Sequence, residues 1–324
     1  MKIAYVMGGV GVCGGTRVVW QHCVELAERG HEAVYGVLNG PECMSWLPGS
    51  VPVVNVGRVY LQEWDVVVAT GWNTWPIVHS SFPKARAKWG FAQMRESMTL
   101  GTPSPNVADY AFSLKGFRVI TISGWLKKYL EEECGQRHVA VIPNGVDTGA
   151  FYPDPLPIKK SRPIALVVGH EFDKAKNISD AVKAIRAAGK FEIWHICPAA
   201  GLVTNIGADK IFVNPPQDQL RRLYSTADIL VMSSRAEGRS CIPVEAMACE
   251  CPVVAMDHLG TEDLQGGRAL IADAGNIEHL AELIRFTMEN PEETASRVGA
   301  AHNYVLTELR WDSIGKRLEE LYSS

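Results

Sequence analysis

The chain has 324 residues, of which 47% are hydrophobic and 21% are charged, and its formal net charge is −4. This length allows two domains with full cores, and the slightly acidic balance gives no general reason to bind nucleic acid. We expect no membrane-spanning segment, because no apolar run reaches the ~20 residues that a bilayer requires.

The eight cysteines are scattered along the chain without a CxxC pair. We therefore expect reduced thiols, no disulfide framework and no metal site. The opening residues MKIAYVMGG begin a strand directly and lack the pattern of a signal peptide. These features favour a cytoplasmic protein.

The first predicted elements are a buried strand at 2–7 and a helix that follows a glycine-rich loop. Gly9, Gly11 and Gly14 have the G-x-G-x-x-G spacing of a phosphate-binding loop before a helix. The second predicted strand, within 31–40, ends without the carboxylate that holds the ribose of a dinucleotide. We therefore expect this loop to serve a phosphate other than that of NAD or FAD.

Strands and helices alternate along both halves of the chain, and the second half starts anew near residue 160. Apolar strands that alternate with helices indicate parallel sheets covered on both faces. The predicted strands lie near 2–7, 33–38, 65–69, 88–93, 118–122 and 138–142, and then at 164–170, 191–197, 209–216, 229–234, 251–257 and 268–273.

The predicted fold class is α/β, with two doubly wound Rossmann-like domains facing across a cleft. The N-terminal domain is expected at 1–152 and the C-terminal domain at 153–307. A last helix at about 308–324 is expected to pack back on the first domain.

Two glutamates follow the predicted strand 229–234, and ligands of parallel sheets bind beyond such strand ends. Glu245 lies inside a short helix that Pro243 helps to open, and the loop before that helix offers N–H groups to a diphosphate. Glu245 can then accept from two ribose hydroxyls, and Glu237 from a sugar on the diphosphate. The alternative is that both are ordinary surface or loop residues.

Several motifs follow one another in a fixed order along the chain. They are Gly14-Gly15 with LAERGHE (26–32), TISGWL (121–126), PNGVDTGAFYP (143–153), VVGHEFDKAKN (167–177) and LYSTADILVMSSRAEGRSCIPVEAMACECPVVAMD (223–257). This ordered set resembles the retaining glycosyltransferases of family 4, which have the two-domain GT-B architecture, and it implies an N-terminal acceptor-side domain and a C-terminal nucleotide-sugar-binding domain. One stretch, FAQMRESMTLG at 91–101, is more similar to the rhamnosyltransferase-like branch.

The resemblance implies transfer of a sugar from a nucleoside diphosphate sugar, of the UDP, GDP or dTDP type, with the anomeric configuration retained. It implies no metal and no cofactor, and a glycan, a lipid-linked saccharide or a natural product as acceptor, as in polysaccharide biosynthesis. Recognition of the base is expected near 197–200 and 214–216. The basic stretch 82–89 allows at most peripheral contact with a membrane.

The resemblance also implies roles for single residues. Lys176 matches the lysine that grips the diphosphate, where negative charge grows on the leaving group, and Glu237 matches the residue that binds the donor sugar. We therefore place both in the catalytic machinery. The remaining donor-binding residues that it implies are Gly14, Gly15, Gly169, His170, Arg239, Ser240, Cys241, Ile242 and Glu245.

Two positions depart from the pattern of the family. His170 stands where an arginine is usual, and we expect Arg239 or Lys174 to supply the missing charge. Gln93 and its neighbours stand where many members have a histidine, and Glu96 is the candidate general base or acceptor-binding group there.

The aromatic residues Trp72 and Trp75 follow a predicted strand, where their faces can bind an acceptor. Core packing is the alternative for both rings.

Two rival functions stay open. A non-hydrolysing sugar-nucleotide epimerase shares the architecture but is not expected to combine PNGVD with EGRSCIPVEAMAC. A catalytically silent GT-B nucleotide-binding module is compatible with the departures at His170 and Gln93.

Overall fold

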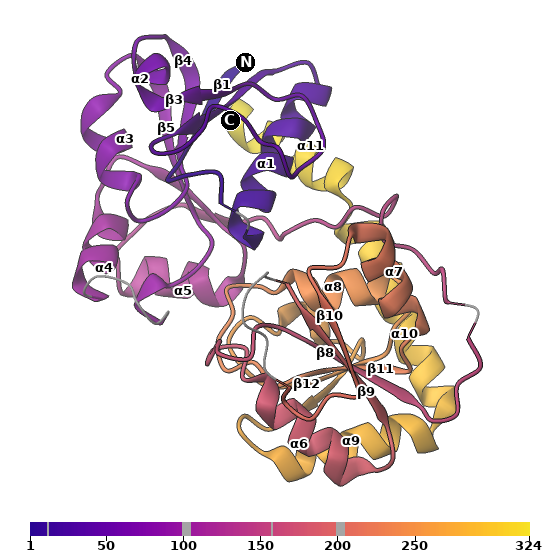
Figure 1. Ribbon diagram of the computed structural model, residues 1–324. Helices are drawn as coiled ribbons and strands as arrows, with labels where there is room; N and C mark the ends of the chain where they lie inside the picture. The colour runs from indigo at the N-terminus through magenta and orange to yellow at the C-terminus, as the bar shows by residue number, and fades with distance from the viewer. Residues whose placement is uncertain (12, 99–104, 157, 199–204) are drawn as a thin grey trace. The chain divides into compact units, whose positions relative to one another are not determined.

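A computed structural model describes residues 1–11, 13–98, 105–156, 158–198 and 205–324 (Figure 1). The chain divides into two compact units, Met1–Gly145 with Trp311–Ser324, and Val146–Arg310. The sequence placed these divisions after residue 152 and near residue 307, so both lie a few residues from the observed ones.

The first unit contains one parallel sheet in the strand order β3-β2-β1-β4-β5-β6-β7. The prediction missed β3, which is only three residues long and follows Pro52. The strands are β1 (Lys2–Met7), β2 (Glu32–Val37), β3 (Val53–Asn55), β4 (Trp64–Ala69), β5 (Ala85–Ala92), β6 (Arg118–Thr121) and β7 (Val139–Val141).

Helices connect these strands, and the last helix of the chain joins the same unit. The hydroxyl of Tyr322 in that last helix lies 2.6 Å from that of Tyr5 in β1, and both side chains are buried. The helices are α1 (Gly14–Glu28), α2 (Val56–Tyr60), α3 (Trp75–Ser81), the 3-10 turn η1 (Glu96–Met98), α4 (Pro105–Ser113), α5 (Gly124–Glu132) and α11 (Trp311–Ser323).

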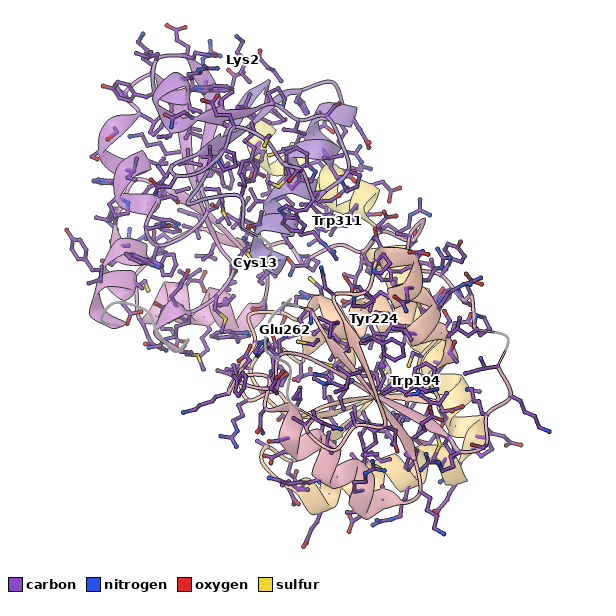
Figure 2. All side chains as sticks on the ribbon, in the orientation of Figure 1. Lys2, Cys13, Trp194, Tyr224, Glu262 and Trp311 are labelled. Carbon is purple, nitrogen blue, oxygen red and sulfur yellow. The ribbon has the colours of Figure 1, made fainter. Side chains whose placement is uncertain are left out.

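Trp311, labelled in Figure 2, begins α11. Its ring packs on Gly145. A Cβ at Gly145 would lie 2.5 Å from the indole ring, so only glycine fits beneath it. One residue further along the chain, Val146 N donates to Leu309 O at 2.7 Å, and Val146 also forms a parallel β-bridge with Arg310. The two ends of the second unit are therefore paired.

The second unit contains a parallel sheet in the order β10-β9-β8-β11-β12-β13. Its strands are β8 (Ile164–Val168), β9 (Glu192–Cys197), β10 (Lys210–Val213), β11 (Ile229–Met232), β12 (Val253–Met256) and β13 (Leu270–Ala272). Its helices are α6 (Ile178–Ala188), α7 (Gln217–Thr226), α8 (Cys241–Ala248), the 3-10 turn η2 (Glu262–Leu264), α9 (Ile277–Glu289) and α10 (Pro291–Glu308).

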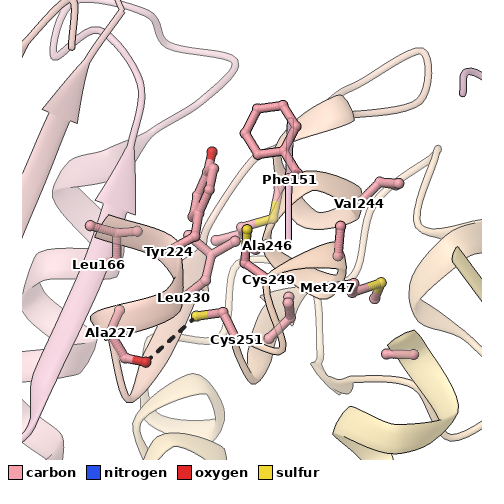
Figure 3. Packing of buried hydrophobic residues seen from close by; sticks show 14 of the residues in the cluster. Phe151, Leu166, Tyr224, Ala227, Leu230, Val244, Ala246, Met247, Cys249 and Cys251 are labelled. Atoms are coloured by element: carbon pink, nitrogen blue, oxygen red, sulfur yellow. Dashed lines mark hydrogen bonds between the residues drawn. The ribbon is translucent and has the colours of Figure 1, made fainter. Parts of the chain in front are cut away.

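Alternate side chains of β8 enter separate cores on the two faces of this sheet. Ile164 and Leu166 belong to the cluster beneath α7, α8 and α10, which Figure 3 shows around Tyr224. Ala165 and Val167 belong to the cluster beneath α6 and α9. Both faces are therefore covered, as near-continuous apolar strands predict.

The cysteines behave largely as small hydrophobic residues. All eight are free, and five of them are buried. Cys249 lies in the core beneath α8 (Figure 3), where burial raises the pKa of its thiol to about 12. Among the described residues, no helix combines the length and apolar character that crossing a bilayer would need.

The strand order of each sheet reverses at one point. The reversal falls between β1 and β4 in the first unit and between β8 and β11 in the second. At such a point the loops leave the sheet in opposite directions beyond the carboxyl ends, which is where open α/β sheets bind ligands.

Candidate functional site

The loops that follow β8 and β11 are joined to each other at the reversal point of the second sheet. Ser233 Oγ donates to Asn177 O at 2.7 Å and accepts from Ala181 N at 3.1 Å. Arg235 N donates to Ala175 O at 2.7 Å. These bonds hold residues 170–177 against residues 233–238.

Lys176 and Glu237 project from these two loops and form an ion pair. Lys176 Nζ lies 2.5 Å from Glu237 Oε1, and Ser234 Oγ donates to the same oxygen at 2.9 Å. The side chains are 22% and 12% exposed, so a ligand can reach both. The structure thus brings together the two residues of this unit that the sequence placed in the catalytic machinery.

Gly169 makes room for this arrangement at the end of β8. Its φ of +152° lies in the region that favours glycine, and a Cβ would lie 3.2 Å from Lys176 Cβ. The next residue, His170, is half-buried, and its Nδ1 accepts from Phe172 N at 3.3 Å. Lys174 is exposed.

The N-terminus of α8 lies just beyond Glu237 in the chain. Ser240 is its N-cap residue, and its Oγ is buried without a hydrogen-bond partner among the residues that the structure describes. Cys241 and Ile242 form the half-buried first turn. A buried hydroxyl and the first-turn N–H groups suit an anion with several oxygens.

Glu245 lies one turn into α8 and is 8% exposed. Tyr224 Oη donates to its Oε2 at 3.4 Å, a long bond. Burial, with Glu245 close by, raises the pKa of Tyr224 well above its usual range, so the phenol stays neutral and can donate. Tyr224 thereby helps to hold the Glu245 carboxylate.

Arg239 has a different partner from the one that the sequence suggested. Its Nε donates to Asp263 Oδ2 at 2.6 Å, its Nη2 donates to Asp263 Oδ1 and, at 3.2 Å, to Tyr304 Oη, and its side chain is only 6% exposed. Asp263 thus neutralises its charge. A buried guanidinium requires a carboxylate, and this pair anchors the loop before α8. Compensation for His170 by Arg239 stays a prediction.

Gly260 supports the same loop from the other side. Its φ is +98°, and a Cβ there would lie 2.6 Å from Glu237 O. The sequence analysis missed both Gly260 and Asp263 as supports of the site. An Arg–Asp pair separated by 24 residues leaves no local pattern in the sequence. In contrast, the glycine in the L-G-T turn at 259–261 could have indicated that another segment of backbone packs closely there.

The first unit carries the glycine loop, and Gly14 and Gly15 form the first turn of α1 rather than preceding the helix. Cys13 is the N-cap residue, with Sγ accepting from Thr16 N at 3.4 Å. Gln93, which follows β5, donates from Nε2 to Gly15 O at 3.2 Å. Among the described residues, a Cβ at Gly14 would meet nothing within 4 Å, so the start of the helix is open there.

Glu96 lies in η1, shortly after Gln93. Burial raises the pKa of its carboxyl to about 7, although hydrogen bonds from backbone N–H groups, one of them that of Trp72, oppose the shift. A carboxyl that titrates near neutrality can act as a general base. The neighbouring Arg95 is engaged elsewhere, in a two-point pair with Glu133 at 2.8 and 2.6 Å.

The two tryptophans after β4 have different environments. Trp72 is half-buried, whereas Trp75 is fully buried between Phe112 and Phe117. A Cβ at Gly90 would lie 2.2 Å from the Trp75 ring, so this ring fills the core above β5. The expectation that Trp75 binds an acceptor is therefore corrected, and Trp72 alone keeps that possibility.

The two stretches expected to recognise the base meet at their described residues Cys197 and Asn214. Asn214 N donates to Cys197 O at 2.7 Å, so the ends of β10 and β9 meet at the carboxyl edge of the sheet. Residues 199 and 200 of the first stretch, and residues 99–101 of the stretch that resembles the rhamnosyltransferase-like branch, lie outside the described residues.

The family model and the curated relatives that match this chain include glycosyltransferases. Residues 202–303, less than half of the chain, match the family model for glycosyl transferases group 1. An uncharacterized glycosyltransferase of Methanocaldococcus jannaschii is 25% identical over 214 residues, which are 63% of this chain and 59% of that protein. Alpha-maltose-1-phosphate synthase of Mycobacterium tuberculosis is 27% identical over 57% of this chain and 56% of its own length.

Two solved structures share the fold of the whole chain. Sucrose-phosphate synthase of Thermosynechococcus elongatus has a TM-score of 0.81 at 17% identity, over 100% of this chain and 98% of its own. HepE of Anabaena, solved with UDP and glucose, has a TM-score of 0.81 at 18% identity, over 100% and 99%.

These comparisons confirm the predicted fold, with two Rossmann-like units, and the resemblance to GT-B glycosyltransferases of the family-4 type. The chain spans less than two thirds of the length of the curated relatives described above. The rhamnosyltransferase-like branch stays a prediction.

Proposed function

We propose that this chain is a glycosyltransferase that moves a sugar from a nucleoside diphosphate sugar to an acceptor, with the anomeric configuration retained. The observation that carries the proposal is the Lys176–Glu237 pair at the β8/β11 reversal, followed in the chain by the N-terminus of α8. A cation, a carboxylate and a helix terminus in one place match the charges of such a donor.

The diphosphate takes the N-terminus of α8. The N–H groups of Cys241 and Ile242 and the Ser240 hydroxyl donate to its oxygens, while Lys176 supplies a full positive charge. Negative charge grows on the departing diphosphate as the glycosidic bond breaks. Lys176 therefore stabilises the transition state more than the bound donor, and the chemistry proposed here needs no metal ion.

The two glutamates take the hydroxyl groups on either side of the diphosphate. Glu245 accepts from the ribose, and Tyr224 keeps its carboxylate oriented. Glu237 accepts from the donor sugar once Lys176 has turned from its carboxylate to the phosphate. The ion pair of the free protein is thus exchanged for two contacts with one ligand.

The acceptor contacts are assigned to the first unit. Glu96 is the general base or the acceptor-binding group, because its pKa of about 7 allows it to accept a proton near neutral pH. Trp72 offers an aromatic face. Acceptors of the glycan, lipid-linked or natural-product type are compatible with these groups, and contact of residues 82–89 with a membrane surface stays part of the proposal.

The relatives support this donor class through what their names state. HepE was solved with UDP-glucose, and a mannosyltransferase of Corynebacterium glutamicum that is 28% identical over a third of this chain is named as GDP-mannose-dependent. We therefore propose UDP-, GDP- or dTDP-linked sugars as donors and a cytoplasmic setting in which such donors are made.

Incubation of the full chain with labelled UDP-glucose, GDP-mannose and dTDP-rhamnose tests the proposal. Transfer to an added saccharide acceptor, or slow donor hydrolysis, supports it, and NMR of the product reports whether the configuration is retained. An isomerised donor would indicate an epimerase, and binding without turnover would indicate a silent module. Failure of UDP, GDP and dTDP to bind at all would overturn the donor site itself.

A further inference from the structure

Three side chains with metal-binding atoms meet at the carboxyl edge of the second sheet. His170 and Glu171 follow β8, and Cys197 ends β9, the neighbouring strand. One ligand atom from each of the three lies within 4.8 Å of those of the other two. Val168 pairs in register with Ile196, so the residues that follow these two positions are brought together by the sheet itself.

Two of the three candidate ligands are buried and the third is partly exposed, which suits an ion bound just beneath the surface. Cys197 is fully buried, the Glu171 side chain is 2% exposed and the His170 side chain is 32% exposed. Two anionic ligands would therefore lie inside, while the imidazole closes the site from the solvent side. A fourth coordination position on that side can be taken by water.

The chemistry of the ligand set selects the kind of ion. Imidazole nitrogen, carboxylate oxygen and thiolate sulfur are all ligands of zinc, which often has three protein ligands and one water. Magnesium and calcium take oxygen ligands, so a thiol at this position disfavours them. The set therefore fits a thiophilic divalent cation better than a hard one.

The distances are close to those of a tetrahedral zinc site. Zinc bond lengths place ligand atoms about 3.4–3.6 Å apart, and His170 Nδ1 lies 3.8 Å from Glu171 Oε2. With all three atoms within 4.8 Å, closure by about 1 Å completes the set. Among the described residues, the half-buried His170 ring accepts a long 3.3 Å bond from Phe172 N and contacts the Phe172 ring, so a movement of about 1 Å costs it one weak hydrogen bond and part of a ring contact.

We propose that His170, Glu171 and Cys197 form a zinc-binding site. The Cys197 thiol loses its proton to solvent as the sulfur–zinc bond forms, so one proton is released for each ion bound and the affinity rises with pH. With a neutral imidazole, the bound site carries two positive and two negative charges. This inference does not rest on the proposed glycosyl transfer. It departs from the expectation of no metal site, which rested on the cysteine spacing and on the family resemblance.

Zinc titration of the metal-free 324-residue chain tests the site, with calorimetry as the readout. His170→Ala, Glu171→Gln and Cys197→Ser each remove one ligand. Loss of a group that merely orients a ligand costs 10–100-fold in affinity, so each variant should weaken zinc binding at least about tenfold. His258→Ala, a half-buried histidine of the same unit, and Cys249→Ser, a buried cysteine, are the matched controls and should bind as wild type does.

Cobalt provides a second readout that is independent of affinity. Co²⁺ in the wild-type site should show a thiolate-to-cobalt charge-transfer band, and Cys197→Ser should lose this band while Cys249→Ser keeps it. Circular dichroism establishes that each variant is folded, and the half-exposed His170→Ala remains informative if a variant of a buried ligand fails to fold. Wild-type zinc affinity in His170→Ala, or loss of the cobalt band in the Cys249→Ser control alone, would overturn the proposal.

Discussion

Lys176 Nζ lies 2.5 Å from Glu237 Oε1, so the two groups proposed to hold opposite parts of the donor neutralise each other in the free protein. Ser234 and the bonds between the two loops fix this arrangement. The site is therefore assembled before a ligand arrives, and the donor has to replace one ion pair by two new contacts. This exchange gives each partner a separate and measurable role.

Replacing Lys176 by alanine should lower kcat/KM by about 100- to 1,000-fold, the range for loss of one group that stabilises charge in a transition state. Donor affinity should also fall, because the diphosphate loses its cation. Steady-state kinetics with the active donor measure both. Lys190→Ala is the matched control, since this exposed lysine follows α6 and has no proposed part in the donor site, and it should leave both constants within about twofold of wild type. Equal losses in the two variants would contradict the assignment.

Removing the carboxylate of Glu245 should weaken binding of the nucleoside diphosphate by about 10–100-fold, the usual worth of hydrogen bonds to a charged group. Calorimetry should also show that Glu245→Gln no longer distinguishes UDP from 2′,3′-dideoxy-UDP, which lacks both ribose hydroxyls. If the substitution and the loss of the ribose hydroxyls each weaken binding independently, so that their losses of binding free energy add, Glu245 does not bind the ribose.

Arg239→Ala should destabilise the second unit by about 3–5 kcal/mol, because it leaves the buried Asp263 carboxylate without its partner. Replacing both residues, as in Arg239→Met with Asp263→Leu, should recover much of this loss. Urea unfolding measures both effects. If Arg239→Ala instead retains wild-type stability and loses only donor binding, Arg239 is a ligand-binding residue and not an anchor of the loop.

The raised pKa of Glu96 predicts a specific dependence on pH. Burial keeps this carboxyl protonated in the folded state up to about pH 7, whereas in the unfolded chain it ionises near its ordinary value of 4.5. Between these two values the unfolded state binds fewer protons, so the stabilising contribution falls as pH rises. Between pH 4.5 and pH 7, the free energy of unfolding should therefore fall less in the Glu96→Gln variant than in the wild type. Urea titrations at several pH values measure this difference.

A catalytic role for Glu96 has a different signature from this effect on stability. If Glu96 is the base, kcat/KM rises with pH through about 7, and Glu96→Gln removes that limb of the profile. An unchanged profile in the variant would leave Glu96 as a structural group.

Gly260→Ala should destabilise the protein by about 1–3 kcal/mol, because alanine at a φ of +98° is strained and its Cβ meets Glu237 O at 2.6 Å. Donor affinity should fall as well, since the Glu237 backbone has to move. Gly299→Ala is the control, because this glycine lies in α10, where a Cβ meets nothing within 4 Å among the described residues. It should be neutral or slightly stabilising in thermal unfolding.

Much of the fold could be predicted because its signals are local. The apolar face of α6 places Ile178, Ala181, Val182 and Ile185 in the core, as the helical spacing predicts. Apart from β3, the strands of both sheets were predicted from short apolar runs. The three-residue strand β3 was not predicted, because its hydrogen bonds to β2 define it as a strand and its own sequence does not.

The site was less predictable, because its geometry depends on which side chains meet across the sheet. The motifs indicated Lys176, Glu237 and Glu245, and the structure places the first two in contact. The charge of Arg239 is evident from the sequence, but its neutralisation by Asp263, 24 residues away, is not. Likewise, the sequence does not show that Trp75 lies over Gly90, whose missing side chain opens the space that the ring fills.

The pairing of Val146 with Leu309 and Arg310 makes residues 146–310 a continuous insertion whose two ends emerge together. A short glycine–serine linker between residues 145 and 311 could therefore reconnect the remaining chain, with Trp311 still seated on Gly145. The excised segment keeps all the strands of its sheet, and it keeps both Val146 and Arg310, which form the bridge at its ends. The second unit can therefore be removed or exchanged through two cut points that lie next to each other, as is usual for domains that tolerate insertion.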